Sequence, residues 1–363
     1  MKIAIDIKEA GATKAGKGYF TFHLLRNLFE IDKENEYLLY SQHKIPGFEE
    51  FPNVKQIAIN SKGFMWHIKV FLDLQKQKID LYFAPTSYII PAFLPRKIRS
   101  IIVVHDLVAF LFKGHNKKAI FIEKLFLKAA LKKSEKVVTV SQNTKNDLIE
   151  RFDYPKSQIE VISCAAAREF QPIPKTDLTE FIKKTDLPEK FFLSVGTLEP
   201  RKNYLSLVTA FSKFHNEHPD YHLIIVGKNG WQYEDIYQQI KQTRISEKIH
   251  TLGYLSTTSL ASLYSLATAL VFPSFYEGFG IPPLEAMQCG CPVICSNNSS
   301  LPEVVGDAAL LIDPQSSNQI AEAMHDLATK PALREKLREE GLTQAKKFSW
   351  KDSAEKFLEG LTF

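Results

Sequence analysis

Short apolar runs alternate with amphipathic segments along most of the chain, and this alternation restricts the fold more than any other feature. Apolar runs of about four to eight residues bounded by turn residues are typical of strands buried in a parallel sheet, and longer segments with helical apolar spacing are typical of covering helices. The segment 19–29 is the first such helix, and Gly11, Gly16 and Gly18 precede it. Strand, glycine-rich turn and helix in that order predict an α/β protein.

The alternation occurs in two successive sets, which predicts two domains. The first set contains the runs KIAIDI, EYLLYS, VKQIAI, IDLYFAP, IRSIIVVHD and EKVVTVS, and the second contains FFLSVGTL, HLIIVG, IHTLGY, ALVFPS, PVICS and ALLID. A proline-containing segment between the sets is typical of a linker, and 363 residues suffice for two domains. We expect two Rossmann-like domains, 1–170 and 171–347, facing across a cleft, with a helix at 348–363 that packs back towards the first domain. Ligands of such sheets bind beyond the carboxyl ends of the strands.

Composition excludes several classes of protein. The chain is 45% hydrophobic and 24% charged, which is globular, and no apolar run approaches the ~18 residues of a membrane-spanning helix. The first residues enter a strand pattern directly, so we expect no signal peptide. The cysteines do not form a disulfide framework at this length, and the three at 289, 291 and 295 flank a predicted buried strand, which favours core residues over a metal site. These features favour a reduced, cytoplasmic protein.

Positive charge is concentrated in the first half of the chain. Residues 1–170 contain 27 Lys and Arg against 18 Asp and Glu, whereas the remainder contains 19 against 23. Eight lysines and two glutamates lie within 113–136. This basic segment is either a solvated helix face or a contact surface for an anionic partner such as lipid headgroups. Nucleic acid is the less favoured partner, because no recognition motif accompanies the charge.

The stretch 273–294, PSFYEGFGIPPLEAMQCGCPVI, contains two glutamates with seven residues between them. The apolar run before it predicts a strand, so Glu277 is expected in the following loop, and two prolines fit the first turn of a helix that carries Glu285. Gly278 and Gly280 would expose backbone amides at the positive end of that helix. Acids there can accept hydrogen bonds from sugar hydroxyls while the amides face a phosphate. A capping acid beside a strained turn is the alternative.

Further polar residues follow other predicted strands. Arg201 and Lys202 lie between a strand and a helix, where they either bind phosphate oxygens or are solvated loop cations. His105 and Asp106 end a strand of the first half, as part of a functional site or as a structural pair. The glycine turn at 15–20 allows close approach of a ligand to the backbone.

These motifs resemble those of the family 4 retaining glycosyltransferases of GT-B fold. The segments VGTLEPRKN, PSFYEGFGIPPLEAMQCGCPVICS and LPEVVGDAALLIDP carry the resemblance, and the glutamate spacing matches the E-x7-E motif of that family. The resemblance covers nearly the whole chain and is strongest at 190–315. In the first half GKGYF replaces a more usual G-x-G-[RK]-[YF], and VISCAAAREF departs from a frequent N-G-[VI]-D.

The resemblance implies a role for each candidate residue. Arg201 and Lys202 would bind the donor diphosphate and stabilise it as it leaves. Glu277 would hold hydroxyls of the transferred sugar, and Glu285 would bind the nucleotide ribose. The remaining implied site residues are His105, near the reaction centre, Gly16 and Gly18, near the phosphates, and Gly278, Phe279 and Gly280, through their amides.

The resemblance also implies a reaction. A hexose would pass from a nucleotide-diphosphate sugar to a glycan or lipid-linked acceptor in polysaccharide assembly, with anomeric retention by front-face attack and without a metal ion or cofactor. GDP-mannose is the expected donor because GTLEPRKN resembles bacterial mannosyltransferases, although UDP- and dTDP-linked sugars stay open. A peripheral position at the inner face of the membrane, through 113–136, would suit a lipid-linked acceptor.

Two other functions remain as alternatives. A nicotinamide-dependent oxidoreductase should carry G-x-G-x-x-G, but Thr21 stands where the third glycine is required after Gly16 and Gly18. A non-catalytic sugar-binding module would have no need for both the acids and the cations.

Overall fold

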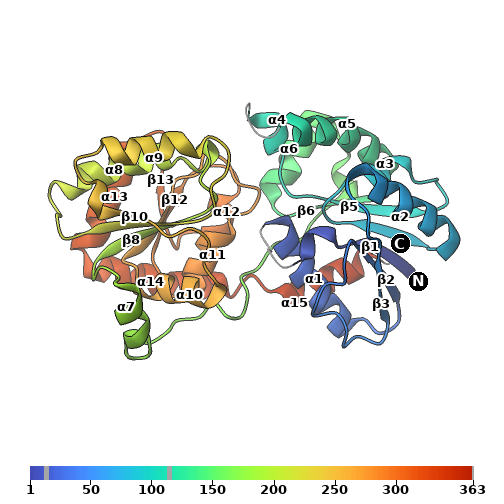
Figure 1. The fold of residues 1–363 in the computed structure, drawn as a ribbon, viewed down its shortest axis with the longest axis horizontal. Coiled ribbons are helices and arrows are strands. Elements are labelled where there is room, and N and C mark those ends of the chain that lie inside the picture. Colours follow the sequence, from blue (N-terminus) through green and yellow to red (C-terminus); the bar gives the residue numbers. More distant parts are fainter. Residues whose placement is uncertain (12–15, 113–116, 362–363) are drawn as a thin grey trace. The chain divides into compact units, whose positions relative to one another are not determined.

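The computed structural model describes residues 1–11, 16–112 and 117–361. The chain forms two compact units, the first made of Met1–Cys164 with Ser349–Phe363 and the second of Ala165–Phe348 (Figure 1). Each unit contains one wholly parallel sheet, so the predicted α/β class with two Rossmann-like domains is confirmed. The units are described separately below.

The sheet of the first unit has seven strands in the order β3-β2-β1-β4-β5-β6-β7. Its strands are β1 (Lys2–Asp6), β2 (Glu36–Ser41), β3 (Val54–Ala58), β4 (Leu81–Ala84), β5 (Arg99–Val104), β6 (Lys136–Thr139) and β7 (Ile159–Val161). Six of them coincide with predicted runs, whereas β7 has only three residues and was not predicted. The strand order reverses between β1 and β4, which makes the loops after these two strands the expected ligand position of this sheet.

Helices cover both faces of this sheet (Figure 1). They are α1 (Lys17–Ile31), α2 (Gly63–Gln77), α3 (Ile89–Phe93), α4 (Val108–Leu111), α5 (Lys117–Lys133), α6 (Gln142–Phe152) and α15 (Trp350–Glu359), with 3-10 turns η1 (Lys8–Ala10) and η2 (Lys156–Gln158). Apolar residues of α2, α3, α5 and α6 pack into one core with the same strand residues. On the other face α15 packs beside α1, and Phe357 of α15 contacts Phe83 of β4 with ring centroids 4.5 Å apart.

The sheet of the second unit has six strands in the order β10-β9-β8-β11-β12-β13. Its strands are β8 (Phe191–Val195), β9 (His222–Val226), β10 (Ile249–Thr251), β11 (Ala269–Phe272), β12 (Val293–Ser296) and β13 (Leu310–Ile312). All six coincide with predicted runs. The order reverses between β8 and β11, so the loops after these strands flank the switch point of this sheet.

The helices of the second unit follow its strands. They are α7 (Thr179–Thr185), α8 (Tyr204–His215), α9 (Tyr233–Gln242), α10 (Thr257–Leu266), α11 (Ile281–Gln288), α12 (Leu301–Val305), α13 (Ser317–Thr329) and α14 (Pro331–Ala345), with 3-10 turns η3 (Lys175–Leu178), η4 (Pro200–Lys202) and η5 (Ser246–Lys248). Serine hydroxyls cap α10 and α13 by accepting backbone N–H groups, which fixes where these helices begin.

None of the helices in the described residues is sufficiently long and apolar to span a lipid bilayer. The cysteines at 164, 289, 291 and 295 are free and buried, as core residues are.

Candidate functional site

The loops after β8 and β11 lie side by side because the two strands are neighbours in the sheet. The backbone N–H of Phe275, in the loop after β11, donates to the carbonyl of Arg201, in η4 after β8, at 2.9 Å. Asn203 holds a third loop, because its side-chain amide donates to the carbonyls of Pro273 (3.0 Å) and Pro314 (2.6 Å). Asn203 adopts a left-handed conformation (φ 61°) between η4 and α8, a position where asparagine is among the tolerated residues. The switch point is therefore tightly constrained.

Four charged side chains form a buried cluster at this switch point. Arg201 contacts Glu199 (Nη2–Oε1, 2.6 Å) and Glu277 (Nη1–Oε2, 2.9 Å). Lys202 contacts the second oxygen of Glu277 (Nζ–Oε1, 2.6 Å). Glu277 thus joins both cations, and the two acids balance the two cations. The sequence predicted Arg201, Lys202 and Glu277 as loop residues, but it gave no reason to select Glu199.

The cluster keeps Glu277 ionised despite its burial. Burial alone would raise the pKa of Glu277, but the charges of Arg201 and Lys202 outweigh it and lower the pKa to about 2. For Lys202 burial has the larger effect and lowers the pKa from its usual value, while Glu277 opposes it. The lowered pKa of Glu277 favours its ionised form, whereas the lowered pKa of Lys202 favours its neutral form. The contact distances place the carboxylate against two cations and therefore favour the ionised form of both groups. Such a fixed, desolvated charge set suits recognition of a charged ligand.

Glu285 lies in a different environment from Glu277. It belongs to α11, is 7% exposed, and accepts a hydrogen bond from the hydroxyl of Tyr264 in α10 at 3.1 Å. Burial raises the pKa of Glu285 to about 7, and the Tyr264 hydrogen bond opposes only part of that shift. The two acids of the E-x7-E motif therefore differ: Glu277 is ionised at neutral pH, whereas Glu285 titrates near it.

The predicted helix with Pro282 and Pro283 in its first turn is confirmed as α11, and the loop before it requires glycine. Gly280 precedes α11 with φ 117°, and a Cβ there would meet Leu301 Cδ2 at 2.7 Å. The N–H of Glu277 donates to Ser299 Oγ at 3.1 Å, so this amide is already engaged. Phe279 is buried and its ring contacts Phe348 with centroids 5.6 Å apart, which leaves only its backbone to meet a ligand.

The predicted site residues of the first half lie in the first unit, around the carboxyl ends of its strands. His105 follows β5, and its Nε2–H donates to the carbonyl of Pro85, after β4, at 2.7 Å. Burial and the nearby charge of Lys17 lower the pKa of His105 to about 4, so its imidazole is neutral at pH 7. Glu123 of α5, which the sequence did not single out, interacts electrostatically with Lys17 and has a buried Oε1 that finds no hydrogen-bond partner among the described residues.

The glycines of the first turn have different roles. A Cβ at Gly18 would lie 2.0 Å from the carbonyl oxygen of Glu9, so glycine is needed there for η1 to pack against α1. Gly16 has φ 44°, and no atom of the described residues beyond its chain neighbours lies within 4 Å of the position of a Cβ, so glycine is required by the backbone conformation of the turn. The preceding residues of this turn, 12–15, lie outside the described residues.

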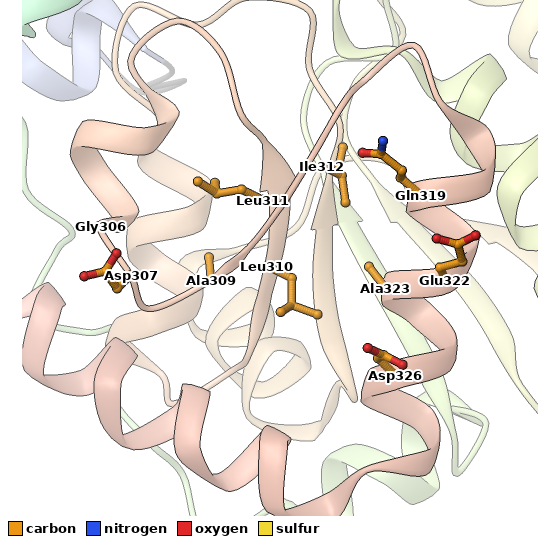
Figure 2. Close-up of a pocket in the computed structure, with 10 residues that line it drawn as sticks. All are labelled: Gly306, Asp307, Ala309, Leu310, Leu311, Ile312, Gln319, Glu322, Ala323 and Asp326. Atoms are coloured by element: carbon orange, nitrogen blue, oxygen red, sulfur yellow. The ribbon is translucent and has the colours of Figure 1, made fainter.

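A separate hollow of about 440 Å³ opens beside the edge strand β13, between the segment that follows α12 and helix α13 (Figure 2). Its lining includes Leu310, Leu311, Glu322 and Asp326, and it contains none of the predicted site residues. Because it has acids and apolar side chains but no cation, we assign the functional site to the charge cluster at the switch point.

The fold is shared with glycosyltransferases of the GT-B type, and comparisons with known proteins show the class of the chain. The sequence profile described as "Glycosyl transferases group 1" matches residues 176–344, and the profile "Glycosyltransferase Family 4" matches residues 36–169. The chain belongs to the family 4 glycosyltransferases.

Among characterised relatives, the chain is similar to O-antigen chain mannosyltransferase B of Escherichia coli, with 34% identity over 283 residues, 77% of this chain and 73% of that protein. It is also 32% identical over 274 residues to the serotype-specific mannosyltransferase WbdA of Escherichia coli, spanning 73% of this chain but only 33% of the relative.

Solved structures share the fold at low sequence identity. Anabaena HepE in complex with UDP and glucose matches with a TM-score of 0.82 and 17% identity, over 100% of this chain and 99% of that one. Sucrose-phosphate synthase of Thermosynechococcus elongatus matches with a TM-score of 0.81 and 20% identity, over 99% of this chain and 97% of that one.

Proposed function

We propose that this glycosyltransferase moves a mannose residue from GDP-mannose to a glycan or lipid-linked acceptor, with retention of anomeric configuration and without a metal ion. The observation that carries the proposal is the buried cluster of Arg201, Lys202 and Glu277 at the switch point. A donor diphosphate supplies the negative charge for which two fixed, desolvated cations are suited. Mannose is proposed because the relatives quoted above are named mannosyltransferases.

The cluster gives each residue a distinct task in this proposal. In the free protein Glu277 holds both cations in place, so little reorganisation is needed when the diphosphate arrives. Arg201 retains Glu199 as a second partner, which keeps its guanidinium oriented when Glu277 turns to the sugar hydroxyls. As the bond to the sugar breaks, the cations stabilise the growing charge on the diphosphate, and a diphosphate oxygen accepts the acceptor's proton. Glu285, once ionised, accepts hydrogen bonds from the ribose.

His105, Gly16 and Gly18 are proposed as the ligand-binding residues of the first unit. The imidazole is neutral and oriented by Pro85, so its Nδ1 can accept a hydrogen bond from a sugar hydroxyl. Gly16 would let the backbone approach the phosphates, and Gly18 would support this turn through its packing against η1.

We further propose that the first unit binds an anionic membrane surface, where a lipid-linked acceptor would lie. Three helices on one face of its sheet expose large apolar side chains: Phe64, Met65, Ile68 and Leu72 on α2, Phe93 on α3, and Phe121 and Leu125 on α5. Exposed lysines at 124, 128 and 132 accompany them on α5. Apolar side chains among lysines are the composition of interfacial helices. Residues 113–116 of the predicted basic segment lie outside the described residues.

The experiment is a donor panel with and without chelator. GDP-mannose, UDP-glucose and dTDP-glucose are incubated with the protein and mannoside acceptors, released nucleoside diphosphate is measured, and the product anomer is assigned by NMR. We expect GDP release from GDP-mannose only, unchanged by EDTA, and an α-linked product. Turnover of a different donor would overturn the assignment of mannose. Loss of turnover in EDTA would overturn the proposed metal independence. A β-linked product would overturn the proposed retention of configuration. Donor binding without turnover of any donor would support the binding-module alternative.

A further inference from the structure

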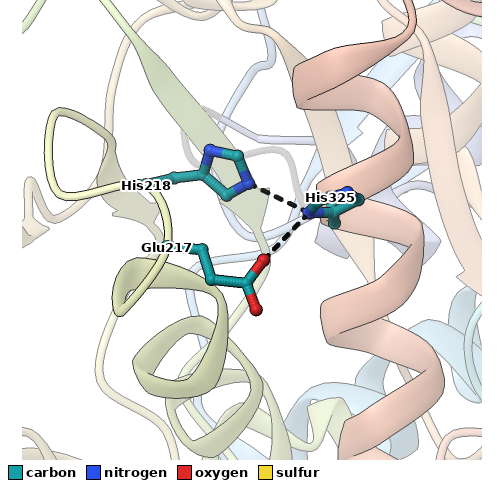
Figure 3. Close-up of side chains that lie close together, drawn as sticks. All are labelled: Glu217, His218 and His325. Carbon is teal, nitrogen blue, oxygen red and sulfur yellow. Dashed lines mark hydrogen bonds and ion pairs between the residues drawn. The ribbon is translucent and has the colours of Figure 1, made fainter.

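A group of three metal-ligating side chains lies in the second unit, remote from the charge cluster. Glu217 and His218 follow the end of α8, and His325 lies on α13 (Figure 3). His325 Nδ1 is 3.0 Å from His218 Nε2 and 3.4 Å from Glu217 Oε2, and one ligand atom of each residue lies within 4.8 Å of the others. In the described part of the chain no other group of this kind occurs.

The protons available in this group do not satisfy all of its contacts. If His218 Nε2–H donates to His325 Nδ1, the lone pair of Nδ1 is occupied and the carboxylate oxygen of Glu217 faces it without a proton between them. If His325 Nδ1 carries the proton, the two acceptors share that single proton. Three ligand atoms that lie within 4.8 Å of one another can instead share a cation.

The surrounding contacts hold the two histidines in place. The His218 ring stacks on Phe214, with centroids 4.5 Å apart and planes inclined by 22°, and its backbone N–H donates to the Phe214 carbonyl. Lys213 of α8 donates to Ser317 Oγ (2.9 Å) and Asn318 Oδ1 (2.7 Å) at the start of α13. Because α8 and α13 pack against each other, a metal ion would find His218 and His325 already close together.

We propose that Glu217, His218 and His325 form a binding site for a divalent transition-metal ion, with Zn²⁺ as the expected occupant. Two imidazole nitrogens and one carboxylate oxygen are a common zinc ligand set, and bonds of about 2.0–2.1 Å in tetrahedral geometry place the ligand atoms ~3.3 Å apart. The observed 3.0 and 3.4 Å separations lie close to that value. Mg²⁺ and Ca²⁺ prefer oxygen ligands and would bind weakly. The half-exposed His325 leaves a fourth position for water.

The site is independent of the proposed transferase reaction. Arg201 and Lys202 lie before the start of α8, separated from it by Asn203, and Glu217 and His218 lie beyond its other end. A helix of 12 residues is about 18 Å long, so a bound ion would not reach the diphosphate position. Its effect would be structural: it would join the segment after α8 to α13 and stabilise the second unit.

Zinc titration of the full chain tests the proposal. Wild-type protein, prepared in EDTA and exchanged into metal-free buffer, is titrated with Zn²⁺ by calorimetry and by thermal unfolding. We expect one Zn²⁺ per chain and a raised unfolding temperature, and a Kd weakened at least about tenfold in His218→Ala and in His325→Ala. Co²⁺ should give the intense visible bands of a tetrahedral site, and Mg²⁺ should have no effect.

A second histidine pair in the same unit provides the matched control. His222 Nδ1 lies 2.8 Å from His250 Nε2, and these rings stack with centroids 5.1 Å apart. His222→Ala should leave the zinc affinity unchanged. No binding of Zn²⁺, or binding that survives His218→Ala and His325→Ala, or binding lost in His222→Ala, would overturn the proposal. Equal unfolding temperatures of all variants in EDTA would exclude misfolding as the cause of lost binding.

Discussion

Two glutamates at a fixed spacing acquire opposite electrostatic properties from their neighbours. Glu277 lies between two cations, which lower its pKa to about 2, whereas Glu285 has an apolar surrounding and one tyrosine hydroxyl, and its pKa rises to about 7. The sequence predicted that Glu277 lies in the loop after a strand and Glu285 in the first turns of the following helix, because strand ends and helix starts can be recognised locally. It did not predict Glu199 as a partner of Arg201, because that pairing depends on the conformation of η4 and of Asn203.

Removing one member of the charge cluster should cost stability as well as activity. Lys202→Met leaves the buried Glu277 with Arg201 alone, so we expect the free energy of unfolding to fall by roughly 2–4 kcal/mol. The double variant Lys202→Met with Glu277→Gln removes the uncompensated charge and should recover part of that loss. Urea unfolding measures both effects.

Donor binding separates function from folding in the same variants. Both proteins lack a cation for the diphosphate, so neither should bind GDP-mannose with wild-type affinity, even where stability is recovered. The assignment of Lys202 to the donor site would fail if the double variant bound the donor as the wild type does. The sugar-facing role of Glu277 predicts that Glu277→Gln alone reduces turnover more than donor affinity.

The raised pKa of Glu285 predicts a pH dependence of stability with a definite sign. The folded-state pKa of about 7 exceeds the ordinary 4.5, so the folded protein binds this proton more tightly than the unfolded chain does. The corresponding stability is fully present below about pH 4.5 and is lost as the pH rises to about 7. Glu285→Gln stays neutral, so its unfolding free energy should decline less steeply across this window, by roughly 3 kcal/mol at most.

Urea unfolding of both proteins between pH 4.5 and 8 measures this difference, and parallel slopes would contradict it. The pH dependence of donor affinity provides a second, independent measurement of the ionisation of Glu285. If the ribose hydroxyls donate to an ionised Glu285, donor affinity in the wild type should increase as the pH rises through 7, and this increase should be absent in Glu285→Gln.

At the scale of single elements, the sequence predicted strands better than surfaces. All of the predicted strands occur, because continuous apolar runs between turns leave few alternatives. The three-residue β7 was missed because so short a run resembles a loop. The sequence also left open which apolar residues of α5 face the core: Phe126 packs towards it, whereas Phe121 and Leu125 are 66% and 53% exposed. The helical spacing of apolar residues could not decide this, because packing against the neighbouring α3 determines which side of α5 faces the core.

The exposed face of α5 predicts salt-sensitive binding to anionic vesicles. Lys124, Lys128 and Lys132 are exposed on this helix beside Phe121 and Leu125. Each lysine contributes about 1 kcal/mol near an anionic leaflet, so the triple alanine variant should bind roughly 100-fold more weakly. Co-sedimentation with vesicles of increasing phosphatidylserine content measures the binding, and added salt should reduce it because screening acts over ~8 Å at physiological ionic strength.

A charge-matched variant distinguishes this surface from the net charge of the chain. Lys183, Lys184 and Lys241 are exposed in the second unit, and their replacement by alanine removes the same charge. That variant should bind vesicles as the wild type does. Equal losses in both triple variants, or no binding of the wild type at low salt, would show α5 to be a solvated surface. The side chains of Lys117 and Lys118, which belong to the same basic segment, are outside the described residues.

At the scale of the whole molecule, the first unit is built from two segments of the chain that are far apart in the sequence. The last 15 residues, 349–363, belong to the first unit although the entire second unit precedes them. Ser349 caps α15 by accepting the N–H groups of Lys351 and Asp352, and Trp350 then packs against Phe20 of α1 with centroids 5.8 Å apart. The sequence predicted a helix at 348–363 that packs back towards the first domain, although its amphipathic pattern alone indicates only that the helix buries one face. The complementary surface of α1 and β4 receives that face.

This arrangement predicts that a core substitution near the C-terminus destabilises the N-terminal half of the chain. Phe357 is 2% exposed and contacts Phe83 of β4, so Phe357→Ala should lower the free energy of unfolding of the first unit by about 3–5 kcal/mol. Hydrogen exchange followed by mass spectrometry should show faster exchange in β1 and β4, with β8 and β11 unchanged. Leu327→Ala, a buried core truncation in α13, is the counterpart and should accelerate exchange in the second sheet alone. Faster exchange of both sheets in Phe357→Ala would mean that the two units unfold together, since the loss of one aromatic contact would then be transmitted through the whole chain.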